Sequence, residues 1–184
     1  MVYLSLLYPP PKSFHDPIPA REIVFAGDSA GGNLTVALIN QLRAANEQPP
    51  SCAWLLSPWT DLTMSGATLD TKDAVDPIIH KGYLGELADA YVPATIDRRN
   101  PLISPLFSDL RGFPPTLVQV GSAEGLLADA TRFAATAGAA DVDVTLEIWP
   151  HMIHAWPMWN AKLDDGRRAL ARAGEFINSR RRTS

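Results

Sequence analysis

The sequence predicts an α/β fold in which a mostly parallel sheet is covered by helices on both faces. Short apolar runs alternate along the chain with segments whose apolar residues recur at helical spacing, which is typical of strand–helix units in a parallel sheet. The runs at residues 23–25 and 52–56 are apolar throughout, as strands buried on both faces require. With 184 residues, 46% of them hydrophobic and 20% charged, the chain fits a single globular domain over residues 1–184.

Each element is expected from a local pattern. Leu34, Leu38 and Leu42, spaced four residues apart, indicate a helix over residues 30–45. The other elements alternate, with strands expected at 22–26, 51–56, 116–120 and 142–149 and helices at 83–91, 126–137 and 160–177. Residues 2–8 are apolar and are followed by three consecutive prolines, so we expect them to be the last turns of a helix that proline terminates.

A nucleophile motif stands at the first strand–helix junction, and in parallel α/β sheets the chemistry lies just beyond such strand ends. Residues 27–32 read Gly-Asp-Ser-Ala-Gly-Gly and match the G-x-S-x-G elbow, with Ser29 at its tip. So tight a turn leaves no room for side chains two residues before and two residues after the serine, and Gly27 and Gly31 have none. The N–H of Ala30, at the start of the helix, is expected to serve as an oxyanion donor. A phosphate loop is disfavoured, because the Gly-Lys-Ser/Thr ending is not there.

A serine nucleophile needs a base, and the base needs an acid that orients it. In proteins that carry this elbow, the acid and then the histidine follow the serine along the chain, each at a strand end. Glu124 lies just past the expected strand 116–120, and His154 lies just past 142–149. Asp129 is the alternative acid, although it falls inside the expected helix, where a solvated or helix-start position is the ordinary reading. His151 is the alternative base.

Other functions find little support in the sequence. A formal charge of −4 and a pI of about 5.5 give no electrostatic reason to expect nucleic acid or an anionic membrane as partner. No apolar run reaches the length of a membrane span and no signal peptide is evident, so we expect a soluble, cytoplasmic protein. His151 and His154 have no third ligand at a suitable spacing, and Cys52 opens a buried strand, so neither a metal site nor a catalytic thiol is expected.

Six motifs resemble the hormone-sensitive-lipase-like branch of the α/β hydrolases, also called the α/β-hydrolase fold-3 family. They cover nearly the whole chain in the family's order. The motifs are Gly-Asp-Ser-Ala-Gly-Gly-Asn at 27–33, Ser-Pro-Trp-Thr-Asp-Leu at 57–62, Asn-Pro-Leu-Ile-Ser-Pro-Leu at 100–106, Gly-Phe-Pro-Pro-Thr-Leu at 112–117, Gly-Ser-Ala-Glu at 121–124 and Trp-Pro-His-Met-Ile-His-Ala-Trp at 149–156. The resemblance implies an acid at Glu124, where many members carry Asp, and a base at His154. It also implies hydrolysis of small carboxylic esters with short to medium acyl chains, without a cofactor.

The chain also departs from this family. Members carry a His-Gly-Gly-Gly motif upstream of the elbow, whose amides supply further oxyanion donors, but this sequence contains no His-Gly dipeptide. Only 28 residues precede Ser29, so the chain is expected to be the C-terminal part of an α/β-hydrolase fold without the early strands and the cap. The elbow strand would then have an exposed apolar edge, through which a homo-oligomer could form.

These observations lead to a serine carboxylesterase or lipase-like hydrolase whose turnover is impaired in this chain. A non-catalytic ligand-binding protein on the same scaffold is the alternative, and the intact candidates for nucleophile and base favour the hydrolase. The alcohol and acyl preferences do not follow from the sequence. Trp156, two residues after the proposed base, is a candidate for the pocket lining, and Asp61 is expected to form a turn.

Overall fold

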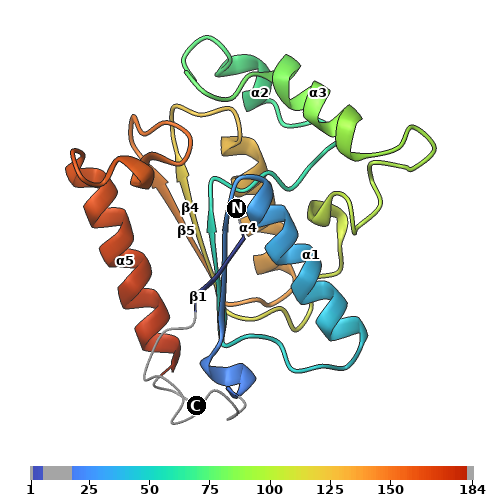
Figure 1. Ribbon diagram of the computed structural model, residues 1–184, viewed down its shortest axis with the longest axis vertical. Coiled ribbons are helices and arrows are strands. Elements are labelled where there is room, and N and C mark those ends of the chain that lie inside the picture. Colours follow the sequence, from blue (N-terminus) through green and yellow to red (C-terminus); the bar gives the residue numbers. More distant parts are fainter. Residues whose placement is uncertain (1, 6–17, 182–184) are drawn as a thin grey trace.

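The computed structural model describes residues 2–5 and 18–181 and contains a five-stranded sheet at its centre (Figure 1). The strands lie side by side in chain order: β1 (Val2–Ser5), β2 (Val24–Asp28), β3 (Cys52–Leu56), β4 (Thr116–Gly121) and β5 (Val144–Trp149). Strands β2 to β5 are parallel neighbours, whereas β1 runs antiparallel to β2. The predicted α/β class with a mostly parallel sheet is therefore confirmed.

Helices cover both faces of this sheet, as expected (Figure 1). The helices α1 (Ala30–Ala44) and α4 (Leu127–Ala139) lie on one face, and α5 (Asp164–Arg181) lies on the other. Two shorter helices, α2 (Thr68–Thr71) and α3 (Lys81–Tyr91), follow β3. Three 3₁₀ turns complete the described elements, at Ala20–Glu22 (η1), Pro105–Phe107 (η2) and Trp156–Trp159 (η3).

The main core fills the space between the sheet and the helices α1 and α4. Its buried side chains come from α1, β3, β4, α4 and the segment before β4, and include Val36, Ile39, Leu55, Leu106, Phe113, Val118, Val120 and Phe133. Burying each of the larger ones contributes about 1.5–3 kcal/mol. The helix α1 was predicted correctly but turns a different face inward. Val36 and Ile39 are fully buried, whereas Leu34 and Leu38 are 46% and 39% exposed.

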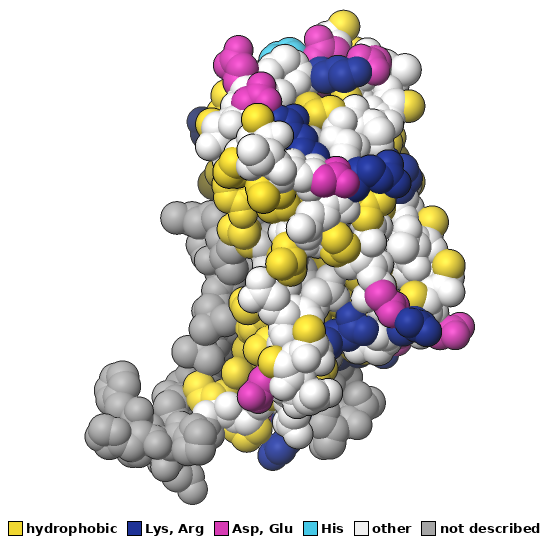
Figure 2. Space-filling model, turned by 90° about the vertical axis from the view of Figure 1, so that its right-hand side faces the viewer, with side chains coloured by type: hydrophobic (Ala, Val, Ile, Leu, Met, Phe, Trp, Pro, Cys, Tyr) yellow, Lys and Arg dark blue, Asp and Glu magenta, His cyan; other side chains and the backbone are white. Residues whose placement is uncertain are grey.

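A second core lies between α4 and the long segment that follows β3. Its buried members are Trp59, Leu62, Leu69, Ile79, Leu84, Ala88, Val92 and Leu126. This core packs α2, α3 and the turns around them together near the carboxyl ends of the strands (Figure 1). The surface over α1 and the segments after α3 carries hydrophobic side chains between two groups of charged ones (Figure 2). In the described part of the chain, no helix has both the length and the apolar character to span a bilayer.

The N-terminal prediction was wrong in part. Val2–Ser5 forms the strand β1, not the end of a helix, and residues 6–8 of the predicted helix lie outside the described residues. The pairing runs from Val2 opposite Gly27 to Ser5 opposite Val24. It gives backbone partners to the edge of β2, which would otherwise leave N–H and C=O groups without partners. The expected exposed edge on β2 is therefore covered by β1, and an oligomer through that edge would have to displace this strand.

Candidate active site

The chain turns sharply at Ser29, between the end of β2 and the start of α1. Ser29 has φ 54° and ψ −121°, a backbone conformation that side-chain-bearing residues rarely adopt and that is common at functional sites. A Cβ on Gly27 would lie 2.1 Å from the carbonyl oxygen of Gly31, and a Cβ on Gly32 would lie 2.7 Å from Cβ of Pro58. Only glycine fits at these two positions. The steric argument made from the sequence is thus supported for Gly27, and Gly32, which that argument did not name, has the same requirement.

Backbone hydrogen bonds attach this turn to the end of β3. The N–H of Ser29 donates to the carbonyl of Leu56 at 3.0 Å. The carbonyl of Ser29 accepts from the N–H groups of Gly32 and Trp59, both at 3.0 Å. Ala30 is the first residue of α1, where N–H groups have no partner within the helix and carry a partial positive charge. The junction therefore holds Ser29 rigidly beside a helix N-terminus suited to an anion.

Glu124 is completely buried three residues beyond β4, and its two carboxylate oxygens have different partners. Oε2 accepts hydrogen bonds from the N–H of Gly121 and the hydroxyl of Ser57, both at 2.8 Å. Oε1 lies 3.3 Å from Nδ1 of His154, whose residue is only 5% exposed. The sequence-predicted acid and base thus form a buried pair.

The alternative base lies elsewhere. His151 is exposed and has φ 62°, and its backbone N–H donates to the hydroxyl of Ser122 at 2.8 Å. Of the two histidines, the structure brings only His154 against Glu124. Among the described residues, no group of three or more His, Cys, Asp or Glu side chains could hold a metal ion.

The alternative acid, Asp129, is buried for another purpose. Of the two expected positions, the helix start is confirmed, since Asp129 lies in the first turn of α4, whereas the solvated position is wrong, since the residue is 0% exposed. Its Oδ2 accepts the backbone N–H groups of Thr60 and Asp61, both at 2.9 Å, and its Oδ1 pairs with Arg132 at 2.9 Å. Burial raises the pKa of Asp129 to about 7, against the opposing effects of Arg132 and the two N–H donors. Asp129 thus anchors the segment after β3.

Asp61 shares this cluster and forms a turn, as its position suggested. Its carboxylate accepts the backbone N–H of Thr63 at 2.9 Å and pairs with Arg132 at 3.0 Å. The side chain is completely buried. Burial by itself would raise the pKa of Asp61, but hydrogen bonds from Ser65, Thr63 and Arg132 outweigh it and lower this pKa below its usual value. The cluster is therefore a structural ion pair that fixes residues 60–65 on α4.

The elbow and the loop that carries His154 are attached to two consecutive residues at the end of β3. Leu56 accepts the N–H of Ser29, and the next residue, Ser57, accepts the N–H of Ala155 through its hydroxyl at 3.1 Å. The parallel register supports this arrangement, since the ends of β2, β3, β4 and β5 lie at one edge of the sheet. The loops that carry Ser29, Glu124 and His154 therefore all begin at this edge, where Glu124 contacts His154.

The contacts of three supporting residues were not predicted from the sequence. Ser57 joins Glu124 to Ala155, as described above. Asp76, which is 1% exposed, accepts the N–H of Gly125 at 2.8 Å. Thr68 donates its hydroxyl proton to the carbonyl of Gly125 at 2.6 Å and accepts the N–H of Ala128 at 2.8 Å. All three connect residues at least 49 positions apart, a separation at which local patterns carry no information.

The structure corrects the interpretation of Trp156. This side chain is 0% exposed and belongs to the core between β3 and α5 instead of a pocket surface. Its ring lies 5.8 Å from that of Trp149, and its Nε1 donates to the carbonyl of Asp165 at 3.4 Å. It therefore contributes to packing around the histidine loop.

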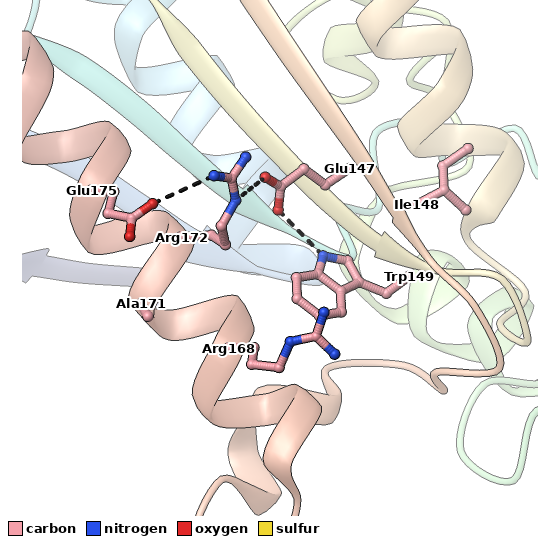
Figure 3. Close-up of a pocket in the computed structure, with 7 residues that line it drawn as sticks. All are labelled: Glu147, Ile148, Trp149, Arg168, Ala171, Arg172 and Glu175. Atoms are coloured by element: carbon pink, nitrogen blue, oxygen red, sulfur yellow. Dashed lines mark hydrogen bonds and ion pairs between the residues drawn. The ribbon is translucent and has the colours of Figure 1, made fainter.

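A groove between β5 and α5 lies apart from this site (Figure 3). It is lined by Glu147, Ile148, Trp149, Arg168, Ala171, Arg172 and Glu175. Arg172 pairs with Glu147 at 3.0 Å and with Glu175 at 3.4 Å, and Arg168 lies over the ring of Trp149 at 5.4 Å (Figure 3). Arg172 and Arg168 thus attach α5 to β5, and the lining of the groove includes none of Ser29, Glu124 and His154.

Comparison with known proteins agrees with this fold. Residues 10–158 match a protein family described as alpha/beta hydrolase fold. An acetyl-hydrolase of Streptomyces hygroscopicus is 41% identical over 161 residues, which are 88% of this chain and 54% of that protein. An esterase of Acinetobacter venetianus is 39% identical over 162 residues, again 88% of this chain and 54% of the relative.

Solved structures give the same result. An esterase from the bacterial hormone-sensitive lipase family matches with a TM-score of 0.86 at 40% identity, over 88% of this chain and 54% of that one. A hormone-sensitive lipase from a metagenome library matches with a TM-score of 0.85 at 39% identity, over 88% of this chain and 54% of that one. The chain belongs to the α/β-hydrolase fold family, and its resemblance to the hormone-sensitive-lipase branch is confirmed. It spans about half the length of the curated relatives it matches.

Proposed function

We propose that this chain carries the catalytic residues of a carboxylesterase, with Ser29 as nucleophile, His154 as general base and Glu124 as the orienting acid. The observation that carries the proposal is the buried contact between Glu124 and Nδ1 of His154, in a loop attached to the same strand end as the elbow. An acid behind a histidine, beside a strained serine, is the arrangement that activates a hydroxyl for acyl transfer.

We propose the following reaction for these residues. His154 takes the hydroxyl proton of Ser29 through Nε2 while the oxygen attacks the ester carbonyl. Glu124 accepts the Nδ1–H proton in a hydrogen bond, which fixes the tautomer and stabilises the imidazolium that forms. The N–H of Ala30 donates to the developing oxyanion. The alcohol leaves with the proton from His154, and water then hydrolyses the acyl-enzyme by the same steps.

The substrate class is proposed from the relatives. One is named an acetyl-hydrolase and another an esterase, which suggests small carboxylic esters with short acyl groups. The reaction as written needs no cofactor, because serine, imidazole and water supply all the atoms and protons. We expect turnover by this chain alone to be weak, because the sequence contains no His-Gly-Gly-Gly motif and each oxyanion donor removed costs about 10²–10³ in rate.

Hydrolysis of p-nitrophenyl acetate and p-nitrophenyl butyrate tests the proposal. The expected result is slow release of nitrophenol that the Ser29→Ala variant abolishes. Release that persists in Ser29→Ala would reject Ser29 as the nucleophile. Fast, Ser29-dependent turnover would keep the triad and reject only the expectation of weak activity.

A further inference from the structure

A buried hydroxyl stands between the proposed acid and the loop of the proposed base. Ser57 is 0% exposed and is the first residue after β3. Its Oγ lies 2.8 Å from Oε2 of Glu124 and 3.1 Å from the backbone nitrogen of Ala155, the residue after His154. Its own N–H donates to the carbonyl of Gln119 on β4 at 2.7 Å, which fixes its backbone.

The direction of these hydrogen bonds is determined by their chemistry. A backbone N–H can only donate, so the Ser57 oxygen accepts from Ala155. The single hydroxyl proton of Ser57 is then donated to Glu124. Oε2 of Glu124 receives this bond together with the one from Gly121, and Oε1 remains for Nδ1 of His154. The carboxylate is thus held with one oxygen occupied and the other facing the imidazole.

The backbone alone gives no reason for serine at this position. Ser57 has φ 45°, in the left-handed region that glycine adopts with the least strain. A serine here accepts a conformational cost, and its two buried hydrogen bonds offset that cost. Since both bonds lead to the acid and the base loop, the hydroxyl has a specific task there.

We propose that Ser57 is a positioning residue that aligns Glu124 with His154 by binding the acid and the histidine loop through one hydroxyl. This inference rests on the proposed function, because it assigns Ser57 a role in the same triad. Without the hydroxyl, Oε2 of Glu124 loses a donor and the N–H of Ala155 loses its acceptor. The carboxylate of Glu124 and the loop of His154 are then no longer bound to the same side chain.

The tautomer of the neutral His154 ring measures this alignment, whether or not the chain turns over esters. Long-range ¹H–¹⁵N NMR at alkaline pH distinguishes a proton on Nδ1 from one on Nε2. We expect a predominantly Nδ1-protonated ring in the parent protein, because Glu124 accepts that proton. The Glu124→Ala variant calibrates the complete loss of the contact, and the exposed His151 serves as an internal reference.

Two variants remove the hydroxyl, and one matched control removes a different one. Ser57→Ala and Ser57→Gly should both shift the His154 ring most of the way toward the Glu124→Ala spectrum. The glycine variant relieves the strain of the positive φ at position 57. If its melting temperature equals or exceeds that of the parent, unfolding does not explain a change in the His154 spectrum. Ser122→Ala removes a hydroxyl that binds His151 on the same loop, and it should leave His154 unchanged.

The results separate this inference from the proposed function. A His154 spectrum that remains parental in both Ser57 variants would overturn the positioning role, even if Ser29 proves to be the nucleophile. A shift of the same size in Ser122→Ala would also overturn it, because any loosening of the loop would then suffice. A shift confined to the Ser57 variants supports the inference, even if Ser29-dependent hydrolysis is not found.

Discussion

Two buried carboxylates five residues apart, Glu124 and Asp129, perform different tasks in this protein. Both are 0% exposed and both accept backbone N–H groups. Glu124 faces His154 and the end of the sheet, whereas Asp129 faces Arg132 and the backbone of residues 60–61. Burial therefore does not identify a catalytic acid. The two carboxylates differ in the group they contact, since Glu124 contacts an imidazole and Asp129 a permanent cation, and we therefore propose the catalytic role for Glu124.

The largest expected difference between the two carboxylates concerns the reactivity of Ser29. Glu124→Gln should slow its reaction with a fluorophosphonate by about 10³–10⁴-fold, since the histidine loses the acceptor that fixes its tautomer. Asp129→Asn, the matched control, should slow it by less than about tenfold after correction for the folded fraction. Labelling rates measured by intact mass check both values. Equal decreases in the labelling rate of the two variants would contradict the different roles of Glu124 and Asp129.

The second expected difference concerns stability and runs the other way. Asp129→Ala leaves Arg132 without one of its two carboxylates and leaves the N–H groups of Thr60 and Asp61 without acceptors. Because the Arg132 side chain is 33% exposed, most of the loss comes from the two buried N–H groups, and each unsatisfied one costs about 1–3 kcal/mol in the free energy of unfolding. In a chain of this length, each kcal/mol lowers the melting temperature by about 2–4 °C. Urea denaturation of Asp129→Ala and Glu124→Ala compares the two sites, and a larger loss in Glu124→Ala would contradict the assignment.

A third difference appears in the pH dependence of stability. Burial raises the pKa of Asp129 to about 7 from its ordinary value of 3.8, so the folded protein retains a proton that the unfolded chain has already released. The stabilising contribution is complete below about pH 4 and is lost as the pH rises through about 7. The urea midpoint should therefore fall between about pH 5 and pH 8 in the parent and fall less in Asp129→Asn. Parallel pH curves for the two proteins would refute this.

The smallest expected effect belongs to a third carboxylate, Asp76. It accepts the N–H of Gly125, next to the proposed acid, and the N–H groups of Ile78 and Ile79. Asp76→Asn replaces one acceptor oxygen by an amide donor and should cost about 1–2 kcal/mol in stability. We expect a loss of about tenfold in Ser29 labelling, because the loop that carries Glu124 shifts slightly. An unchanged labelling rate in the folded variant would show that Asp76 does not affect the position of Glu124.

The elements with strong local patterns could be predicted from the sequence. Short apolar runs predicted β2, β3 and β4, alternating apolar residues predicted β5, and the G-x-S-x-G motif predicted the elbow. The chain order of acid and base led to the Glu124–His154 contact. Weak patterns failed where a short run fits two structures, as at Val2–Ser5, where four apolar-rich residues do not distinguish a strand from the end of a helix.

The rest depended on contacts between distant segments. The last helix begins at Asp164 instead of Asn160, because turns at residues 160–162 follow the 3₁₀ segment Trp156–Trp159. The inward face of α1 is set by the sheet it meets, so the leucine spacing did not reveal it. The supporting role of Ser57 requires knowledge that β3 lies between the elbow strand and the strand of the acid.

The most direct test of the proposed triad is the site of fluorophosphonate labelling on the folded chain, determined by peptide mass spectrometry. An activated serine reacts with this probe, whereas an ordinary surface serine does not. We predict a single adduct on Ser29, whose formation His154→Gln and Glu124→Gln greatly slow and His151→Gln leaves nearly unchanged. Modification of another serine, or a labelling rate at Ser29 that does not depend on His154, would contradict it.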